Sequence, residues 1–113
     1  MEDVFCKIVK KESTATIVFE DEVCLGILDI HPETKGHTLI IPKTHYADVH
    51  DMPEEVFAHI CKMAKKRADE LYQDYTAVTI AHNTGTLRDV DHFHMHICGF
   101  KGTEKNNLAT TAS

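Results

Sequence analysis

The stretch His92-Phe93-His94-Met95-His96-Ile97-Cys98 places three histidines at every second position, with apolar residues between them. In a β-strand successive side chains point to opposite faces, so the three imidazoles share one face and the Phe, Met and Ile side chains share the other. In a helix the same spacing would scatter the imidazoles over roughly 200° of the circumference, at about 100° per residue. The pattern therefore predicts a strand with one face in the core and the other in a chemical site.

Three histidines in register are hard to explain as solvent-facing residues, because such a strand face normally mixes Lys, Glu, Thr and Ser. Clustered titratable groups tend to mark functional sites. Two kinds of site remain open from the residues alone: metal ligation, or acid–base and nucleophilic chemistry at phosphorus. Alternate residues of a strand are ~6.6 Å apart at Cα, so the outer two histidines, at roughly 13 Å, are awkward ligands for one ion.

Length and charge narrow the class of protein. A chain of 113 residues forms one domain, expected over residues 1–100, that can bury roughly two thirds of its unfolded surface. The formal net charge is −6, from 12 basic and 18 acidic residues. That balance argues against a general nucleic-acid or membrane-surface binder, so an anionic ligand needs a local site. The nine histidines can supply one, because imidazole carries or exchanges a proton near neutral pH.

The four cysteines, Cys6, Cys24, Cys61 and Cys98, are widely spread, which is typical of a reducing compartment rather than of a disulfide framework. No basic segment followed by an apolar run opens the sequence, and no run approaches the ~20 apolar residues of a membrane span. We therefore expect a cytoplasmic protein.

Apolar patterning predicts an α+β domain: an antiparallel sheet of about five strands, one long helix packed across it, and a short N-terminal helix. The short helix is expected over residues 4–11, with Phe5, Ile8 and Val9 inward. The long helix is expected to start at an Asp51 cap with Glu54 in a capping box. The polar tail, residues 101–113, is expected to be mobile. The strands are expected over residues 15–20, 23–30, 37–42, 76–81 and 92–100.

Several further motifs occur in order with the three histidines, and together they resemble the histidine triad (HIT) family, in its Hint-like branch. The resemblance covers about residues 4–100. The motifs are Phe5-Cys6-Lys7-Ile8, Phe19-Glu20-Asp21, Leu28-Asp29-Ile30-His31-Pro32, Gly36-His37-Thr38-Leu39-Ile40-Ile41-Pro42-Lys43 and the triad itself.

The resemblance implies a nucleotide hydrolase or nucleotidyl transferase with a nucleotidyl-histidine intermediate. The middle histidine, His94, would attack the α-phosphorus of a nucleoside phosphoramidate or related adduct, which suits a neutral imidazole. The backbone carbonyl of His92 would accept a hydrogen bond from His94 and fix its tautomer. His96 and His37 would lie around the α-phosphate and the leaving group, where donors stabilise developing charge. A purine nucleoside monophosphate would be released.

The same resemblance assigns substrate contacts. Asn83 would contact the substrate next to the phosphate, and Gly85 would allow close backbone approach. Asp29 would accept the ribose hydroxyls, with Leu28 and Ile30 over the base. Phe5, Ile8 and Phe19 complete the expected base pocket.

One segment departs from the family pattern. Relatives carry Gly-Gln-Ser/Thr-Val before the triad, and this chain has Leu87-Arg88-Asp89-Val90-Asp91. The Arg88 guanidinium can hold phosphate in place of glutamine, whereas the Asp89 carboxylate would repel it.

No cofactor is implied for the reaction, and the resemblance allows a structural zinc ion. Microbial relatives bind zinc through an N-terminal Cys-x-x-Cys pair and two histidines. Here the matching set is Asp3, Cys6, His45 and His92, and zinc accepts all three residue types.

The implied partners are a purine nucleotide and a second copy of the chain, since relatives of this branch are homodimers; no nucleic acid or membrane is implied. The alternatives are a dinucleoside polyphosphate hydrolase, a nucleotide-binding adaptor with little turnover, and a metal-dependent enzyme that uses the triad as ligands.

Overall fold

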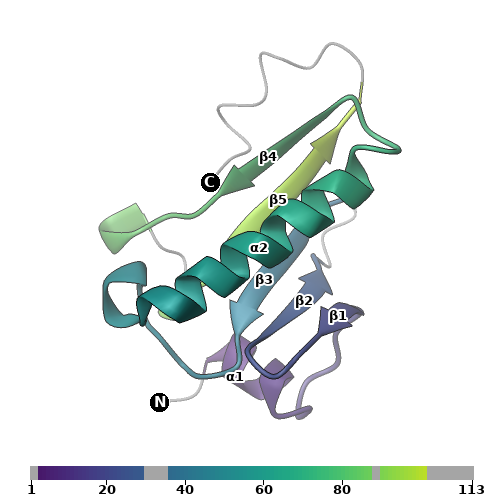
Figure 1. Cartoon of the computed structure of the whole chain (residues 1–113). Helices are drawn as coiled ribbons and strands as arrows, with labels where there is room; N and C mark the ends of the chain where they lie inside the picture. Colours follow the sequence, from purple (N-terminus) through teal and green to yellow (C-terminus); the bar gives the residue numbers. More distant parts are fainter. Residues whose placement is uncertain (1–2, 30–35, 88–89, 102–113) are drawn as a thin grey trace.

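The structure is a computed structural model that describes residues 3–29, 36–87 and 90–101. Five strands form one antiparallel sheet in the order β1-β2-β3-β5-β4 (Figure 1). The helices of the described part are α1 (Val4–Val9), α2 (Glu54–Leu71) and the 3-10 helices η2 (Val49–Asp51) and η3 (Gly85–Leu87). The strands are β1 (Ile17–Glu20), β2 (Cys24–Leu28), β3 (Thr38–Pro42), β4 (Ala77–Ala81) and β5 (Met95–Phe100). The predicted α+β fold is confirmed.

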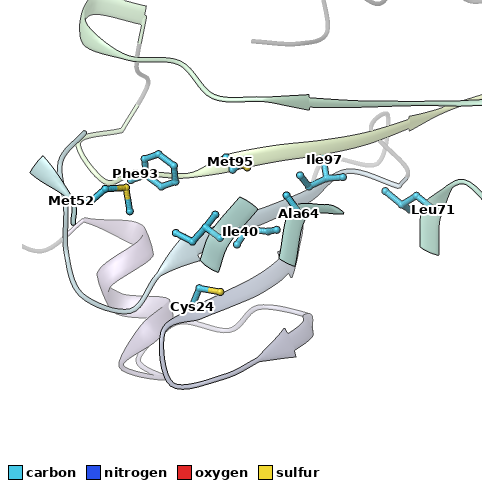
Figure 2. Packing of buried hydrophobic residues seen from close by; sticks show 9 residues of the cluster. Cys24, Ile40, Met52, Ala64, Leu71, Phe93, Met95 and Ile97 are labelled. Carbon is cyan, nitrogen blue, oxygen red and sulfur yellow. The ribbon is translucent and has the colours of Figure 1, made fainter. Parts of the chain in front are cut away.

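The long helix α2 crosses one face of the sheet (Figure 1) and covers the larger of two hydrophobic clusters. Ile60 and Ala64 of α2 pack there against Ile40 of β3 and against the apolar residues of the histidine stretch. Figure 2 shows Phe93, Met95 and Ile97 in this packing, next to Ile40 and Ala64. The apolar half of the alternating pattern is therefore core, as predicted.

The opposite face of the sheet carries the second cluster, which α1 covers. Phe5 and Ile8 of α1 are buried there, as predicted, against Leu25, Ile27 and Ile41 of β2 and β3. Asp3 caps α1 by accepting a hydrogen bond from the Cys6 amide at 2.8 Å. The helix ends at Val9, two residues earlier than expected, because Lys11 adopts a left-handed backbone with φ of 64°.

The histidine stretch is only partly β-strand, which corrects the predicted strand over residues 92–100. β5 begins at Met95, so His96 is on the strand while His92 and His94 precede it. The ladder between β3 and β5 stops at the Ile40–Met95 pair, and the Phe93 amide instead donates to the carbonyl of Tyr46 at 2.7 Å. The side chains nevertheless keep their alternation across the sheet.

The predicted cap of α2 is wrong. Pro53 is the N-cap of α2 and provides no side-chain hydrogen bond. Asp51 belongs to η2, where its Oδ2 accepts from the Asp48 amide at 3.1 Å and Asp48 caps the helix in return. The capping box therefore belongs to η2 and not to α2. Pro53 separates the two helices, because its backbone is extended (ψ 148°).

The other strands begin or end one or two residues inside their predicted limits. Ile30, Arg88, Asp89 and all but the first residue of the expected mobile tail lie outside the described residues. Among the described helices, none is long and apolar enough to cross a membrane.

Candidate active site

The three histidines of the stretch lie together on the α1 face of the sheet. All are buried, with exposed fractions of 0% for His92, 9% for His94 and 8% for His96. The rings of His94 and His96 are 4.9 Å apart between centroids, and the Phe5 ring contacts both His92 and His94 at 5.6 and 5.0 Å. The chain thus builds an imidazole cluster with apolar α1 residues beside it.

The orientation of His94 follows from a backbone contact. Its Nδ1 lies 2.8 Å from the carbonyl oxygen of His92. A carbonyl only accepts, so Nδ1 carries the proton and donates it. Nε2 of His94 is then left with its lone pair, which is the form of imidazole that can act as a nucleophile.

A second chain of contacts runs from β2 to β5 through His37. His37 Nε2 lies 2.8 Å from His96 Nδ1, and His37 Nδ1 lies 2.9 Å from Asp29 Oδ2. The carboxylate favours the proton on His37 Nδ1, so His37 Nε2 accepts from His96. His96, His37 and Asp29 therefore form a chain of contacts in which the carboxylate can stabilise a proton on the imidazoles.

The four residues proposed as zinc ligands meet at the start of α1. One ligand atom from each of Asp3, Cys6, His45 and His92 lies within 4.8 Å of all the others. His92 Nδ1 is 3.2 Å from Asp3 Oδ1 and 3.5 Å from Cys6 Sγ, while His45 Nε2 is 3.3 Å from Asp3 Oδ2. Oxygen, sulfur and two nitrogens form a donor set that tetrahedral zinc accepts.

The tautomer of His92 is the one that could bind a metal ion in this cluster. His92 Nε2 lies 3.2 Å from the carbonyl of Pro42, so it donates there and leaves a lone pair on Nδ1, facing the Asp3 carboxylate. Burial lowers the pKa of His92, which opposes a second proton on the ring. Burial also opposes ionisation of Asp3, but the Cys6 amide and the charges of His92 and His45 together lower its pKa. A metal ion relieves the repulsion between carboxylate and lone pair, so these residues fit zinc.

Two residues predicted for the base pocket lie on the wrong face. Phe19 packs against the α2 cluster, because a β-bulge between Ile17 and Phe19 pairs Phe19 with Gly26 and turns its ring to that side. Leu28 pairs with Thr38, whose hydroxyl accepts from Arg67 of α2, so Leu28 also faces α2.

Phe5 and Ile8 remain on the histidine face, and Ile27 joins them there. Sequence reasoning missed Ile27, although strict alternation in β2 from Asp29 places it on the same face as that carboxylate.

The loop before the triad, at Thr84 and Gly85, is hydrogen-bonded to the carboxylate of Asp48, which the sequence analysis did not identify. Asn83 is half-buried and Gly85 exposed. Asp48 accepts hydrogen bonds from the Thr84 hydroxyl and the Gly85 amide, both at 2.8 Å. His82 Nδ1 lies 3.4 Å from the His94 carbonyl. No sequence signal joins Asp48 to this loop, because the two are 36 and 37 residues apart.

Known proteins are similar to this chain in sequence and in fold. A model of the HIT domain matches residues 10–103. The adenosine 5′-monophosphoramidase of Saccharomyces cerevisiae is 36% identical over 107 residues, which span 93% of this chain and 66% of that protein. A HIT family protein of Bacillus anthracis has a crystal structure with a TM-score of 0.82 at 35% identity, covering 88% of this chain and 73% of that one.

A zinc-bound member is also similar. The crystal structure of a Zn-bound histidine triad family protein from Mycobacterium smegmatis has a TM-score of 0.81 and is 38% identical, covering 90% of this chain and 77% of that one. The resemblance found in the motifs thus extends to sequence and backbone over most of the chain. By these matches the chain belongs to the HIT family, in its Hint-like branch.

Proposed function

We propose that this protein releases a purine nucleoside 5′-monophosphate from a phosphoramidate or related adduct through a nucleotidyl-histidine intermediate on His94. The observation that carries the proposal is the contact between His94 Nδ1 and the His92 carbonyl at 2.8 Å. It keeps the proton on Nδ1 and leaves the Nε2 lone pair of His94 available as a nucleophile. The naming of the yeast relative as an adenosine 5′-monophosphoramidase supports the substrate class.

In the first step His94 Nε2 forms a bond to the α-phosphorus while the bond from phosphorus to the leaving nitrogen or oxygen breaks. The leaving group takes up a proton, which doubly protonated His96 donates from Nε2 while its Nδ1 keeps the proton that faces His37. The contact of His96 with His37, and of His37 with Asp29, keeps positive charge favourable on this line of groups. In the second step water attacks phosphorus and gives a proton to Nε2 of His96, the phosphorus–nitrogen bond to His94 breaks, and the monophosphate leaves.

The nucleotide's base and ribose are proposed to lie along the α1 face. Phe5, Ile8 and Ile27 offer buried apolar side chains there, and Asp29 is one strand position beyond Leu28 on the same side as Ile27. Asn83 and Gly85 are proposed to contact the phosphate side of the substrate. No cofactor takes part in these steps. Zinc at Asp3, Cys6, His45 and His92 would hold the start of α1 against the triad and supply no chemistry to the reaction.

We further propose that the protein acts as a homodimer. β4 is an edge strand of the sheet, and its Ile80 is 52% exposed. An exposed apolar edge strand is a surface that pairs readily with a second copy. Sedimentation of the wild-type chain and of Ile80→Lys tests the assembly, and a wild-type monomer at micromolar concentration would contradict it.

The deciding experiment measures AMP release from adenosine phosphoramidate by the wild-type chain, by His94→Ala and by His50→Ala, with AMP binding measured alongside. His50 is exposed and outside the cluster, so it is the matched control. Turnover in the wild type and in His50→Ala, a loss of several orders of magnitude in His94→Ala, and a nucleotidylated wild-type protein by mass spectrometry are expected. Equal, negligible turnover with retained AMP binding would instead describe a nucleotide-binding adaptor. Faster cleavage of a dinucleoside polyphosphate would assign that substrate class.

A further inference from the structure

Asp48 is a buried carboxylate between two segments that are distant in the sequence. It is 8% exposed and precedes η2, where its Oδ1 accepts from the Val49 amide at 2.7 Å. From the other side, the Thr84 hydroxyl donates to Oδ1 and the Gly85 amide donates to Oδ2, both at 2.8 Å. A carboxylate is costly to bury unless its oxygens accept hydrogen bonds. Two of the donors that make the burial of Asp48 favourable therefore come from the loop.

The loop that contains Thr84 and Gly85 is exposed to solvent. Thr84, Gly85 and Leu87 are exposed, and Leu87 keeps 69% of its surface. The Leu87 amide reaches the Thr84 carbonyl at 3.4 Å, which is a long contact. Gly85 has φ of 64°, a left-handed conformation that glycine adopts without steric cost. Exposed segments open at low free energy, so the two hydrogen bonds to Asp48 stabilise the position of this loop.

The same carboxylate also borders the histidine behind the nucleophile. His82 Nε2 is 3.7 Å from Asp48 Oδ1, and His82 Nδ1 is 3.4 Å from the His94 carbonyl. The His82 ring packs on Phe93 with centroids 4.2 Å apart, which fixes it against the core. Both distances are long for a strong hydrogen bond. Packing on Phe93 and the charge of Asp48 therefore hold the His82 ring in place more than hydrogen bonds do.

We propose that Asp48 is the positioning residue of the substrate-binding loop: by holding Thr84 and Gly85 it places Asn83 against the nucleotide's phosphate, with His82 bracing the backbone of His94. This inference rests on the proposed function, because it assigns the loop to the nucleotide. Asp48 itself touches no reacting atom. Its loss should therefore change nucleotide affinity and KM more than the rate of the chemical step.

Four variants test the proposal. Asp48→Asn removes the charge that the loop donors need. Thr84→Val removes one donor at an exposed position, and Thr84→Ser restores the hydroxyl. Asp51→Asn is the matched control, because it removes a carboxylate charge from the same short helix, keeps an amide oxygen that can accept from the Asp48 amide, and leaves the loop's acceptor in place.

Four quantities are measured: KM and kcat for adenosine phosphoramidate, the affinity for AMP, and the rate of hydrogen exchange at the Gly85 amide. Asp48→Asn is expected to raise KM and weaken AMP binding by about tenfold or more, as for the loss of a charge-assisted hydrogen bond. Exchange at Gly85 should accelerate in parallel. Thr84→Val should raise KM, weaken AMP binding and accelerate exchange at Gly85, each by less than Asp48→Asn does. Thr84→Ser and Asp51→Asn should resemble the wild type.

Two results would overturn the proposal: unchanged KM and Gly85 exchange in both Asp48→Asn and Thr84→Val, or equal changes in Asp51→Asn. Thr84→Val decides the matter if Asp48→Asn fails to fold, because Thr84 is exposed. A wild-type chain without turnover would contradict the proposed function, and AMP affinity with Gly85 exchange would then decide the positioning role independently.

Discussion

His94 Nδ1 lies 2.8 Å from the backbone carbonyl of His92, so the orientation of one imidazole depends on the main chain of another histidine and not on its ring. The His92 ring has different partners: Asp3, Cys6 and the Pro42 carbonyl. The two histidines therefore have separable roles, although they are two residues apart.

Substitution of the two histidines should separate stability from turnover. His92→Asn keeps the carbonyl that orients His94 but removes a fully buried ring, so it should cost about 2–4 kcal/mol of stability and retain measurable turnover. His94→Asn should remove turnover and cost less stability than His92→Asn, because the His94 ring lacks the contacts with Asp3, Cys6 and the Pro42 carbonyl. Urea unfolding and AMP release, measured on both variants, check this. Equal losses of turnover in the two variants would mean that the His92 ring itself serves the reaction.

Asp29→Asn should lower turnover through His37. Asp29 Oδ2 lies 2.9 Å from His37 Nδ1, and the amide that replaces the carboxylate supports positive charge there less well. A loss of about 10–100-fold in kcat is expected, with both a riboside and a 2′-deoxyriboside phosphoramidate as substrates. A loss confined to the riboside would show that the carboxylate acts on the ribose hydroxyls alone.

Zinc should bind the cluster at the start of α1 in a ratio of one ion per chain. Removing zinc with a chelator should lower the melting temperature and leave AMP release intact, because the ion ties Asp3 and Cys6 to His92 at the edge of the triad. Cys6→Ser should weaken zinc binding by at least about tenfold, and Asp3→Cys should strengthen it, since thiolate is the better ligand.

Metal analysis and thermal unfolding measure both effects. Cys61→Ser is the control, because Cys61 is exposed on α2 and outside the cluster. Zinc retained in full by Cys6→Ser would place the ion elsewhere.

Acid stability should depend on the pair of Asp21 and His59, which joins the β1–β2 hairpin to α2 at 2.7 Å. Burial opposes ionisation of Asp21, but hydrogen bonds from His59 and the Cys24 and Val23 amides outweigh it and lower the pKa from 3.8 to about 2. Because the folded-state pKa is below the unfolded one, this stabilisation is complete well above pH 3.8 and is lost as the pH falls through about 2.

Asp21→Asn should therefore lower the free energy of unfolding by about 1 kcal/mol near neutral pH, a modest value because the pair is partly exposed. The variant should also flatten the decline of stability below pH 3.8. Urea unfolding between pH 6 and pH 2.5 measures it. Asp69→Asn, which breaks the exposed pair with Lys65, should leave the pH dependence unchanged. A parallel decline in the wild type and Asp21→Asn would contradict the role of this pair.

Local pattern determined most of the fold. The alternation in the histidine stretch placed Phe93, Met95 and Ile97 in the core and the imidazoles on the other face, because side-chain direction in extended chain has a period of two. The stripe of α2 was readable for the same kind of reason, since its period of 3.6 leaves one face for the sheet. Asp3 and Cys6 could be matched with His45 and His92 only through the family resemblance.

Some features depend on the tertiary structure and cannot be predicted from sequence periodicity. A β-bulge reversed the side of Phe19, a single inserted residue being enough to exchange the two faces of a strand. Asp48 and the loop at Thr84 and Gly85 meet across 36 and 37 residues, so no local pattern relates them. The sequence by itself determined which residue types face the core and which face the site. Only the folded chain determined which of those polar atoms lie within 3 Å of one another, because these contacts depend on strand register and loop path.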